Sequence, residues 1–303
     1  MLMDEYFSAM KNVLTKAENT QRETILAAAD EIANRLEKGG AWHIMDTGHM
    51  LMFEAVGRTG GMMAIKPIKI TCEIQNPVRY RPSPARGIIG YDSIPGFADY
   101  VLGRANVLPE DVIMIGSVSG YNYFPVDLAI KANEMGCATI ALTSVEYSSH
   151  LTSKHPSGKR LFEACTYCID NCTNYGDTLV DVPALGQGIC PASGISASYL
   201  MWALQSTVVE KLLANDRDVP VSLIRRYSMN YEGFQCVLHL CRVACGMDSM
   251  VLGEVEIIHQ VKSAYLVAKE LGACDGELNI AFQEALAAAK AVATESDATR
   301  LPI

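Results

Sequence analysis

The chain has few aromatic residues and little positive charge. Tryptophan occurs twice, and aromatic residues make up 7% of the 303 residues. Acidic residues (34) outnumber Lys and Arg (25), which gives a net charge of −9. Nonspecific binding to nucleic acid or anionic membranes needs a basic face, so the charge argues against both. No run approaches the roughly 18 apolar residues of a membrane helix, and the first residues lack the basic segment of a secretory signal. We therefore expect a soluble, cytoplasmic protein.

Disulfides and metal sites are also poorly supported. The chain has ten cysteines, but a disulfide framework is typical of short secreted proteins, and most of these cysteines lie within apolar segments. Cys165, Cys168 and Cys172 suggest a metal site, yet no second pair at ligand spacing accompanies them. We expect free, mostly buried thiols, and no metal or other cofactor.

The first 225 residues follow an α/β pattern. Residues 1–40 predict two helices, the second opened by a capping box of Thr20 and Glu23 and ended by Gly39 and Gly40. Short apolar runs then alternate with helical segments at 95–104 and 125–135, which predicts a parallel sheet covered on both faces. A long apolar helix at 195–214 closes this part. The apolar runs that predict the strands lie at 42–45, 62–65, 112–115, 139–142 and 167–169.

The last part of the chain lacks strand signals. It predicts three helices at about 232–245, 254–271 and 277–296, of which the first two end at Gly246 and Gly272. We therefore expect an α/β domain over residues 1–225 and a small all-helical segment over residues 226–303.

Two loops with hydroxyl side chains follow neighbouring strands of the predicted sheet. Ser117-Val-Ser-Gly120 lies between an apolar run and a helix, so backbone N–H groups, two hydroxyls and a helix N-terminus converge there. Thr143 and Ser144 follow the next strand and should lie at the same edge of the sheet. The alternative for either loop alone is an ordinary strand–helix turn. Together they predict a phosphate site.

Several strings in residues 1–225 resemble the sugar isomerase (SIS) phosphosugar-binding domains. They include Asp46-Thr-Gly-His-Met50, the loop at 117–120, and Ser153-Lys-His-Pro-Ser-Gly-Lys-Arg-Leu-Phe162. The resemblance implies a flavodoxin-like three-layer fold, a homodimer or higher homo-oligomer, and a sugar phosphate as ligand. It places the sugar ring over Gly48 and His49, and the phosphate on Ser117, Ser119, Gly120, Thr143 and Ser144.

The chemistry of such a site is open between catalysis and sensing. An isomerase or a lyase needs a general base, for which Glu54, His49 and His155 are the candidates. Each also has a structural explanation: a solvent-facing carboxylate, a capping histidine and a surface loop residue respectively. A non-catalytic sugar-phosphate sensor is the alternative.

Residues 226–303 resemble another family, the catalytic N-terminal domain of glutamyl-tRNA reductase. The match rests on Gly246-Met-Asp-Ser-Met-Val-Leu-Gly-Glu254, which contains Ser249 and Glu254, and on Gln260. The Thr-Cys-Asn-Arg-Thr-Glu motif that carries the nucleophilic cysteine of that family is absent. We expect a retained helical core without reductase activity. The rival hypothesis is a tetrapyrrole-pathway protein that binds tRNA through residues 226–303.

Overall fold

The chain forms two compact units, which we describe separately. The computed structural model describes residues 1–48, 50–51, 54–56, 61–62, 64–71, 94–214, 231–247, 255–274 and 276–295. The first unit contains Met1–Gly57 and Met62–Tyr227, and the second contains Ser228–Ile303 together with Arg58–Gly61. The predicted boundary after residue 225 lies outside the described residues.

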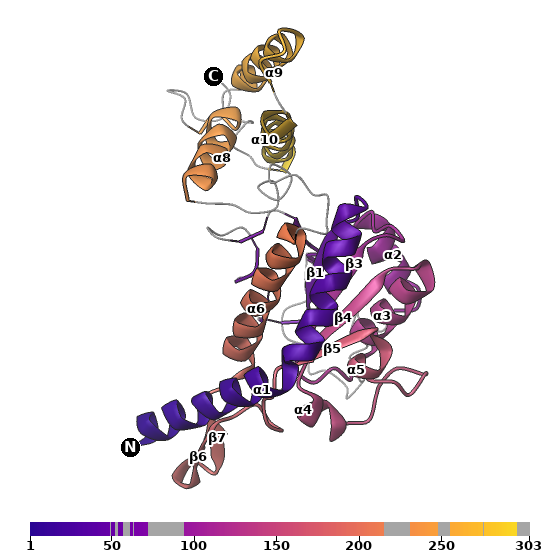
Figure 1. Cartoon of the computed structure of the whole chain (residues 1–303), viewed down its shortest axis with the longest axis vertical. Coiled ribbons are helices and arrows are strands. Elements are labelled where there is room, and N and C mark those ends of the chain that lie inside the picture. Colours follow the sequence, from indigo (N-terminus) through magenta and orange to yellow (C-terminus); the bar gives the residue numbers. More distant parts are fainter. Residues whose placement is uncertain are drawn as a thin grey trace, which may run out of the picture. The chain divides into compact units, whose positions relative to one another are not determined.

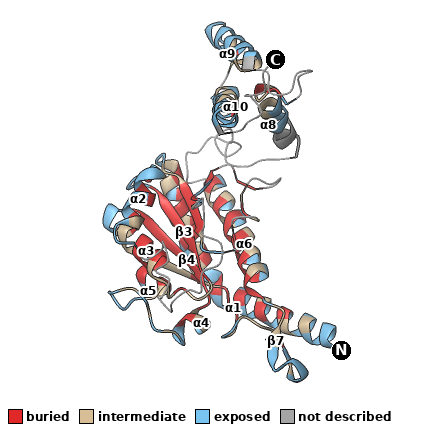
Figure 2. Ribbon diagram, turned by 180° about the vertical axis from the view of Figure 1, so that it is seen from behind, coloured by how far each residue is buried: buried red, intermediate tan, exposed pale blue. Residues whose placement is uncertain are grey.

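A five-stranded parallel sheet forms the centre of the first unit (Figure 1). Its strand order is β2-β1-β3-β4-β5. The side chains of β3 and β4 are buried throughout (Figure 2), because helices cover both faces of the sheet. Near-continuous apolar runs are typical of such strands. The strand bounds are β1 Trp42–Asp46, β2 Ile65–Pro67, β3 Val112–Gly116, β4 Ala138–Thr143 and β5 Tyr167–Asp170.

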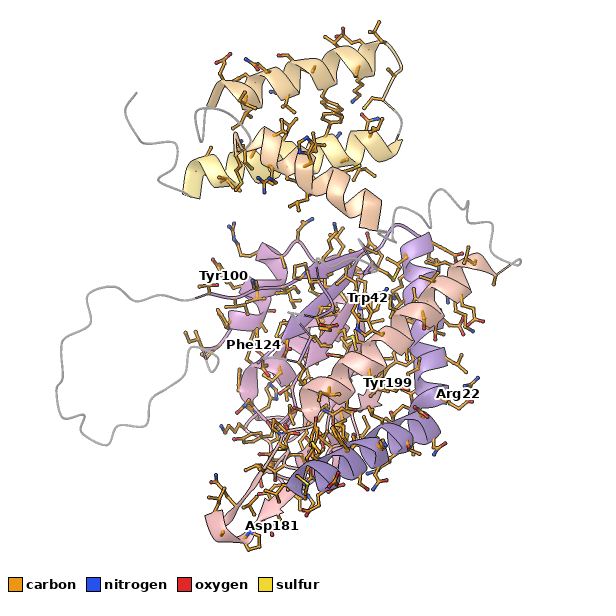
Figure 3. The ribbon with its side chains drawn as sticks, turned by 90° about the vertical axis from the view of Figure 1, so that its left-hand side faces the viewer. Arg22, Trp42, Tyr100, Phe124, Asp181 and Tyr199 are labelled. Carbon is orange, nitrogen blue, oxygen red and sulfur yellow. The ribbon has the colours of Figure 1, made fainter. Side chains whose placement is uncertain are left out.

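The helices divide into two layers around the sheet. Helices α1 (Leu2–Glu37) and α6 (Ser193–Leu213) pack on one face, where Trp42 is fully buried. Helices α2 (Phe97–Arg104), α3 (Tyr123–Met135) and α5 (Leu161–Ala164) pack on the other face with Phe124. Both aromatic residues are labelled in Figure 3. The predicted three-layer α/β architecture is confirmed.

The predicted break in the first helix is wrong. Residues 2–37 form one continuous helix, and the Thr20 hydroxyl donates to the carbonyl of Lys16 at 2.8 Å instead of capping a new helix. Buried positions continue through this region at helical spacing, so packing against α6 overrides the local capping pattern. The helix ends as predicted, because Gly39 adopts a φ of +90° and its N–H donates to Leu36.

Several short elements have no counterpart in the predicted pattern. Strands β6 (Val180–Val182) and β7 (Gln187–Ile189) form an antiparallel hairpin around a 3₁₀ turn, Pro183–Leu185. Asp181 is labelled on this hairpin in Figure 3. Helix α4 (Val145–Ser149) follows β4 directly. The second predicted strand, at 62–65, begins three residues later, at Ile65.

The described residues of the second unit form the three predicted helices. They are α8 (Tyr231–Ala244), α9 (Val255–Glu270) and α10 (Gly276–Glu295). Ala244, Ala285 and Ala289 are buried between them. The stacked rings of Tyr265 and Phe282 lie where α9 and α10 pack. No helix in the described parts of the chain is long and apolar enough to span a membrane.

Candidate phosphate-binding site

The carboxyl ends of the strands bring the predicted polar residues to one edge of the sheet. Asp46 of β1 pairs in register with Gly116 of β3, and Gly116 pairs with Leu142 of β4. Ser117 follows Gly116 directly, and Thr143 follows Leu142. Ligands of open α/β sheets bind at this edge, where the loops and helix N-termini meet.

The loop after β3 presents a series of free donors. The N–H of Ser117 donates to the carbonyl of Leu142 at 3.1 Å and ties the loop to β4. Within the described part of the chain, the N–H groups of residues 118–121 donate to no acceptor. The hydroxyls of Ser117 and Ser119 also have no partner among the described residues, although Ser117 is only 2% exposed. This segment can therefore accept an anion without breaking an existing hydrogen bond.

Gly120 is required by the shape of this loop. Its φ is +56°, a conformation that costs other residues free energy. A Cβ atom there would lie 2.9 Å from the Thr143 hydroxyl and 3.2 Å from Cβ of Leu161. It would also lie 3.2 Å from the hydroxyl of Ser148, which is fully buried and has no hydrogen-bond partner among the described residues. No sequence pattern points to Ser148, since the short helix α4 that carries it has no periodic signal.

Thr143 and Ser144 lie at the predicted edge, but their hydroxyls bond within the protein. Thr143 donates to the carbonyl of Val118 at 3.0 Å. Ser144 donates to the carbonyl of Thr173 at 2.6 Å and accepts the N–H of Tyr147 at the start of α4. Both side chains are fully buried. They hold the loop after β3 and α4 in place, so the donors of this edge that lack an acceptor among the described residues belong to the loop after β3.

The turn after β1 is organised by Asp46. Its carboxylate accepts the N–H of Gly48 at 2.9 Å and the N–H of Leu51 at 2.5 Å. Gly48 is exposed, and a Cβ atom there would meet nothing within 4 Å. Glu54 is half-buried and accepts the indole N–H of Trp202 from α6 at 3.3 Å. His49 lies outside the described residues.

His155 is held by groups on both sides of its ring. One ring nitrogen, Nε2, lies 3.4 Å from the carboxylate of Asp127 on α3. The other, Nδ1, accepts the N–H of Ser157 at 3.1 Å and lies 2.8 Å from the hydroxyl of the same residue. The ring also packs on Tyr123. Both ring nitrogens of His155 therefore have partners in this structure.

The loop that contains His155 is hydrogen-bonded to the loop after β3. The N–H of Lys154 donates to the carbonyl of Tyr121 at 2.9 Å, and the N–H of Leu161 donates to the carbonyl of Gly120 at 2.7 Å. At its end, Arg160 binds Glu163 through two side-chain N–H groups at 2.7 and 2.9 Å. These hydrogen bonds hold the pKa of Glu163 down at about 2.

The cysteines near β5 are free thiols, of which Cys172 is buried and Cys165 and Cys168 are half-buried. Burial raises the pKa of Cys168 to about 12 and also raises those of Cys165 and Cys172. A thiol with a raised pKa is a poor nucleophile and a poor metal ligand at neutral pH. No group of three or more metal-ligating side chains occurs within the ranges that the structure describes.

Only one of the candidate residues of the helical unit can be described. Gln260 is exposed on α9, whereas Ser249 and Glu254 lie outside the described residues. Near the start of α10, Asn279 accepts the hydroxyl of Tyr265 at 2.9 Å, and Gln283 donates to that hydroxyl at 3.1 Å. These bonds join α9 to α10 and give the unit a structural polar cluster.

Comparison with known proteins gives two family matches. Residues 5–144 match the SIS domain family model. Residues 197–296 match the model of the N-terminal domain of glutamyl-tRNA(Glu) reductase, and this match begins within α6. A UPF0309 protein of Shouchella clausii is 29% identical over 221 residues, which cover 72% of this chain and 88% of that protein. A UPF0309 protein of Geobacillus kaustophilus is 28% identical over 234 residues, covering 77% and 89%. A solved phosphoheptose isomerase from Francisella tularensis is 14% identical, with a TM-score of 0.38, covering 68% of this chain and 95% of its own.

Proposed function

We propose that this protein binds a phosphorylated sugar at the carboxyl edge of its sheet. The observation that carries the proposal is the run of N–H groups at residues 118–121 that have no acceptor within the described ranges, with the hydroxyls of Ser117 and Ser119 beside it. Consecutive N–H groups next to a helix N-terminus form an anion-binding concavity. The SIS domain match over residues 5–144 includes this loop and supports a sugar phosphate as the anion.

In this proposal the residues at the carboxyl edge of the sheet have different roles. The N–H groups of the loop and the hydroxyls of Ser117 and Ser119 bind the phosphate oxygens. Gly120 provides the turn, while Thr143 and Ser144 hold the loop and α4 through the hydrogen bonds described above. The sugar would extend over Gly48 toward the turn after β1, on the side where Glu54 lies.

The experiment is calorimetric titration of the full chain with glucose 6-phosphate, fructose 6-phosphate and ribose 5-phosphate. The free sugars serve as controls. Ser119→Ala removes one donor to a charged group and should weaken binding roughly 10- to 100-fold. Ser206→Ala is the matched control, because the Ser206 hydroxyl is exposed and donates to a carbonyl within α6. Equal affinities for sugar phosphates and free sugars would contradict the proposal.

We further propose Glu54 as the general base if the bound sugar is isomerised or undergoes elimination. Its carboxylate is half-buried and oriented by Trp202. Glu54→Gln should abolish proton exchange between the bound sugar phosphate and D₂O, followed by NMR, and leave the dissociation constant within about threefold. Binding without exchange in the wild-type protein would identify a sensor instead.

Self-association is part of the same proposal. The first turns of α1 expose Met3 and Phe7, which are 53% and 52% exposed. A second copy of the chain would cover such apolar side chains. Light scattering of the purified chain should give at least twice the mass of 32.9 kDa, and a monomer at micromolar concentration would contradict this expectation.

A second candidate function follows from the match over residues 197–296. If the helical unit recognised tRNA, the chain should shift glutamate tRNA in a native gel at low salt. We expect no shift, because the net charge is −9 and tRNA binding depends on neutralising phosphates with Lys and Arg. A shift that disappears in Lys262→Glu would favour the tRNA hypothesis over ours.

A further inference from the structure

We propose that Lys154 supplies the positive charge of the phosphate site and that Asn122 positions its ammonium group there. This inference rests on the proposed function and names a further binding residue of the same site. The class of ligand that this site would bind is a compact phosphate monoester, whose negative charge is balanced by one cation beside a cluster of N–H donors.

The backbone fixes Lys154 next to the phosphate loop. Its N–H donates to the carbonyl of Tyr121, the residue that follows the loop. Its side chain then returns over the same residue, with Nζ 4.5 Å from the centre of the Tyr121 ring. The ammonium also donates to Oδ1 of Asn122 at 2.9 Å. Two contacts therefore hold the charge at the junction between the loop and α3.

The charge of Lys154 is not compensated by an acid. In the described ranges no carboxylate lies within 4.0 Å of its ammonium, and both of its side-chain contacts, Tyr121 and Asn122, are neutral. The neighbouring cation, Arg160, is paired with Glu163, and His155 lies against Asp127. Residues 117–122 contain no charged side chain. Among the described residues, Lys154 is therefore a cation without an acidic partner that contacts the residues directly after this loop.

The contact with Asn122 also leaves α3 open to a ligand. Asn122 is the N-cap residue of α3, yet its side chain caps no N–H of the helix, because its oxygen accepts from Lys154 instead. Asparagine at this position ordinarily satisfies one of the first N–H groups. The uncapped start of α3, the loop N–H groups without an acceptor among the described residues, and the lysine charge thus lie at one place.

A buried hydroxyl beside the loop is a further sign that the place is built for a ligand. Ser117, in the loop itself, is only 2% exposed as a residue. The hydroxyl of Ser148 is fully buried and unpartnered under Gly120. Burying a hydroxyl without a hydrogen bond costs free energy. A bound phosphate would give the Ser117 hydroxyl a partner.

Three variants of the full chain separate the roles. Lys154→Ala removes the charge. Asn122→Asp keeps the size and the contact of the cap residue but places a carboxylate against the ammonium. Lys159→Ala is the matched control, since it removes a lysine from the same loop that makes no ion pair among the described residues.

Calorimetric titration with glucose 6-phosphate, fructose 6-phosphate and ribose 5-phosphate measures the effect, with a thermal melt of each variant. Lys154→Ala should weaken the tightest of these roughly tenfold or more, and Lys159→Ala by less than about twofold. Asn122→Asp should weaken binding about as much as Lys154→Ala, while its melting temperature stays equal or rises, because aspartate is also a good N-cap residue.

The outcomes distinguish this inference from the proposed function. If the wild-type chain binds a sugar phosphate and Lys154→Ala binds it as well as Lys159→Ala does, the inference about Lys154 is overturned and the proposed function stands. If the wild-type chain binds none of the three, the proposed function fails and the role of Lys154 with it. If Lys154→Ala weakens binding and Asn122→Asp binds as tightly as the wild-type chain, the role of Asn122 is overturned.

Discussion

Replacement of Gly120 by alanine tests the geometry of the phosphate loop most sharply. Gly120 has a φ of +56°, and moving an alanine into this region costs about 1–2 kcal/mol. The new Cβ would also lie 2.9 Å from the Thr143 hydroxyl and 3.2 Å from Cβ of Leu161. Overpacking of this kind typically costs about 1–3 kcal/mol. We therefore expect Gly120→Ala to lower the free energy of unfolding by about 2–5 kcal/mol.

Gly158 provides the matched control. It also has a positive φ, +72°, but a Cβ atom there would meet nothing within 4 Å. Gly158→Ala should therefore cost only the conformational part, about 1–2 kcal/mol. The difference between the two variants isolates the contacts under the loop.

Urea unfolding followed by tryptophan fluorescence measures both variants. The two tryptophans, Trp42 and Trp202, both belong to the first unit, so the signal reports that unit. If Gly120→Ala proved as stable as Gly158→Ala, the loop would have room for a Cβ, and the close packing against Thr143 and Leu161 would be refuted.

Three further predictions concern other parts of the first unit. Asp177 accepts the first N–H groups of α6, so Asp177→Ala should lower the free energy of unfolding by about 1–2 kcal/mol in urea melts, and an unchanged midpoint would refute this. Because burial raises the pKa of Cys168 to about 12, thiol labelling at pH 8 should be more than roughly a hundredfold slower there than at the exposed Cys236; equal rates would contradict it. Hydrogen bonds from Arg160 hold the pKa of Glu163 at about 2, so Glu163 stabilises the fold at neutral pH and loses this contribution as the pH falls below about 4.5. The difference in melting temperature between wild type and Glu163→Gln should shrink over that range, and a constant difference would refute the pairing.

The sequence predicts β3 and β4 well because both strands are buried on both faces. Every residue of Val112–Gly116 and of Ala138–Thr143 is buried, and such short, mostly apolar segments are typical of strands in a parallel sheet that is covered on both faces. The first helix was divided wrongly because Thr20 and Glu23 satisfy a local rule, whereas contacts of α1 with α6 span more than 150 residues of chain. Local patterns cannot report such distant packing.

The candidate site divides in the same way. The place of Ser117 and Ser119 in one loop after β3 is predictable, because the hydroxyl and N–H donors of this loop are consecutive in sequence. Thr143 was also placed correctly at the edge, but its hydrogen bond to Val118 depends on the register of β3 and β4. Lys154 reaches Asn122 across 32 residues, so its place beside the loop follows from the fold and not from spacing.

The central claim is that the loop after β3 binds the phosphate of a sugar phosphate. A crystal structure of the full chain with the tightest ligand of the titration series tests it most directly. We predict phosphate oxygens within about 3.2 Å of the backbone nitrogens of residues 118–121 and of the Ser119 hydroxyl. A sugar phosphate bound elsewhere, with this loop empty, would contradict the account.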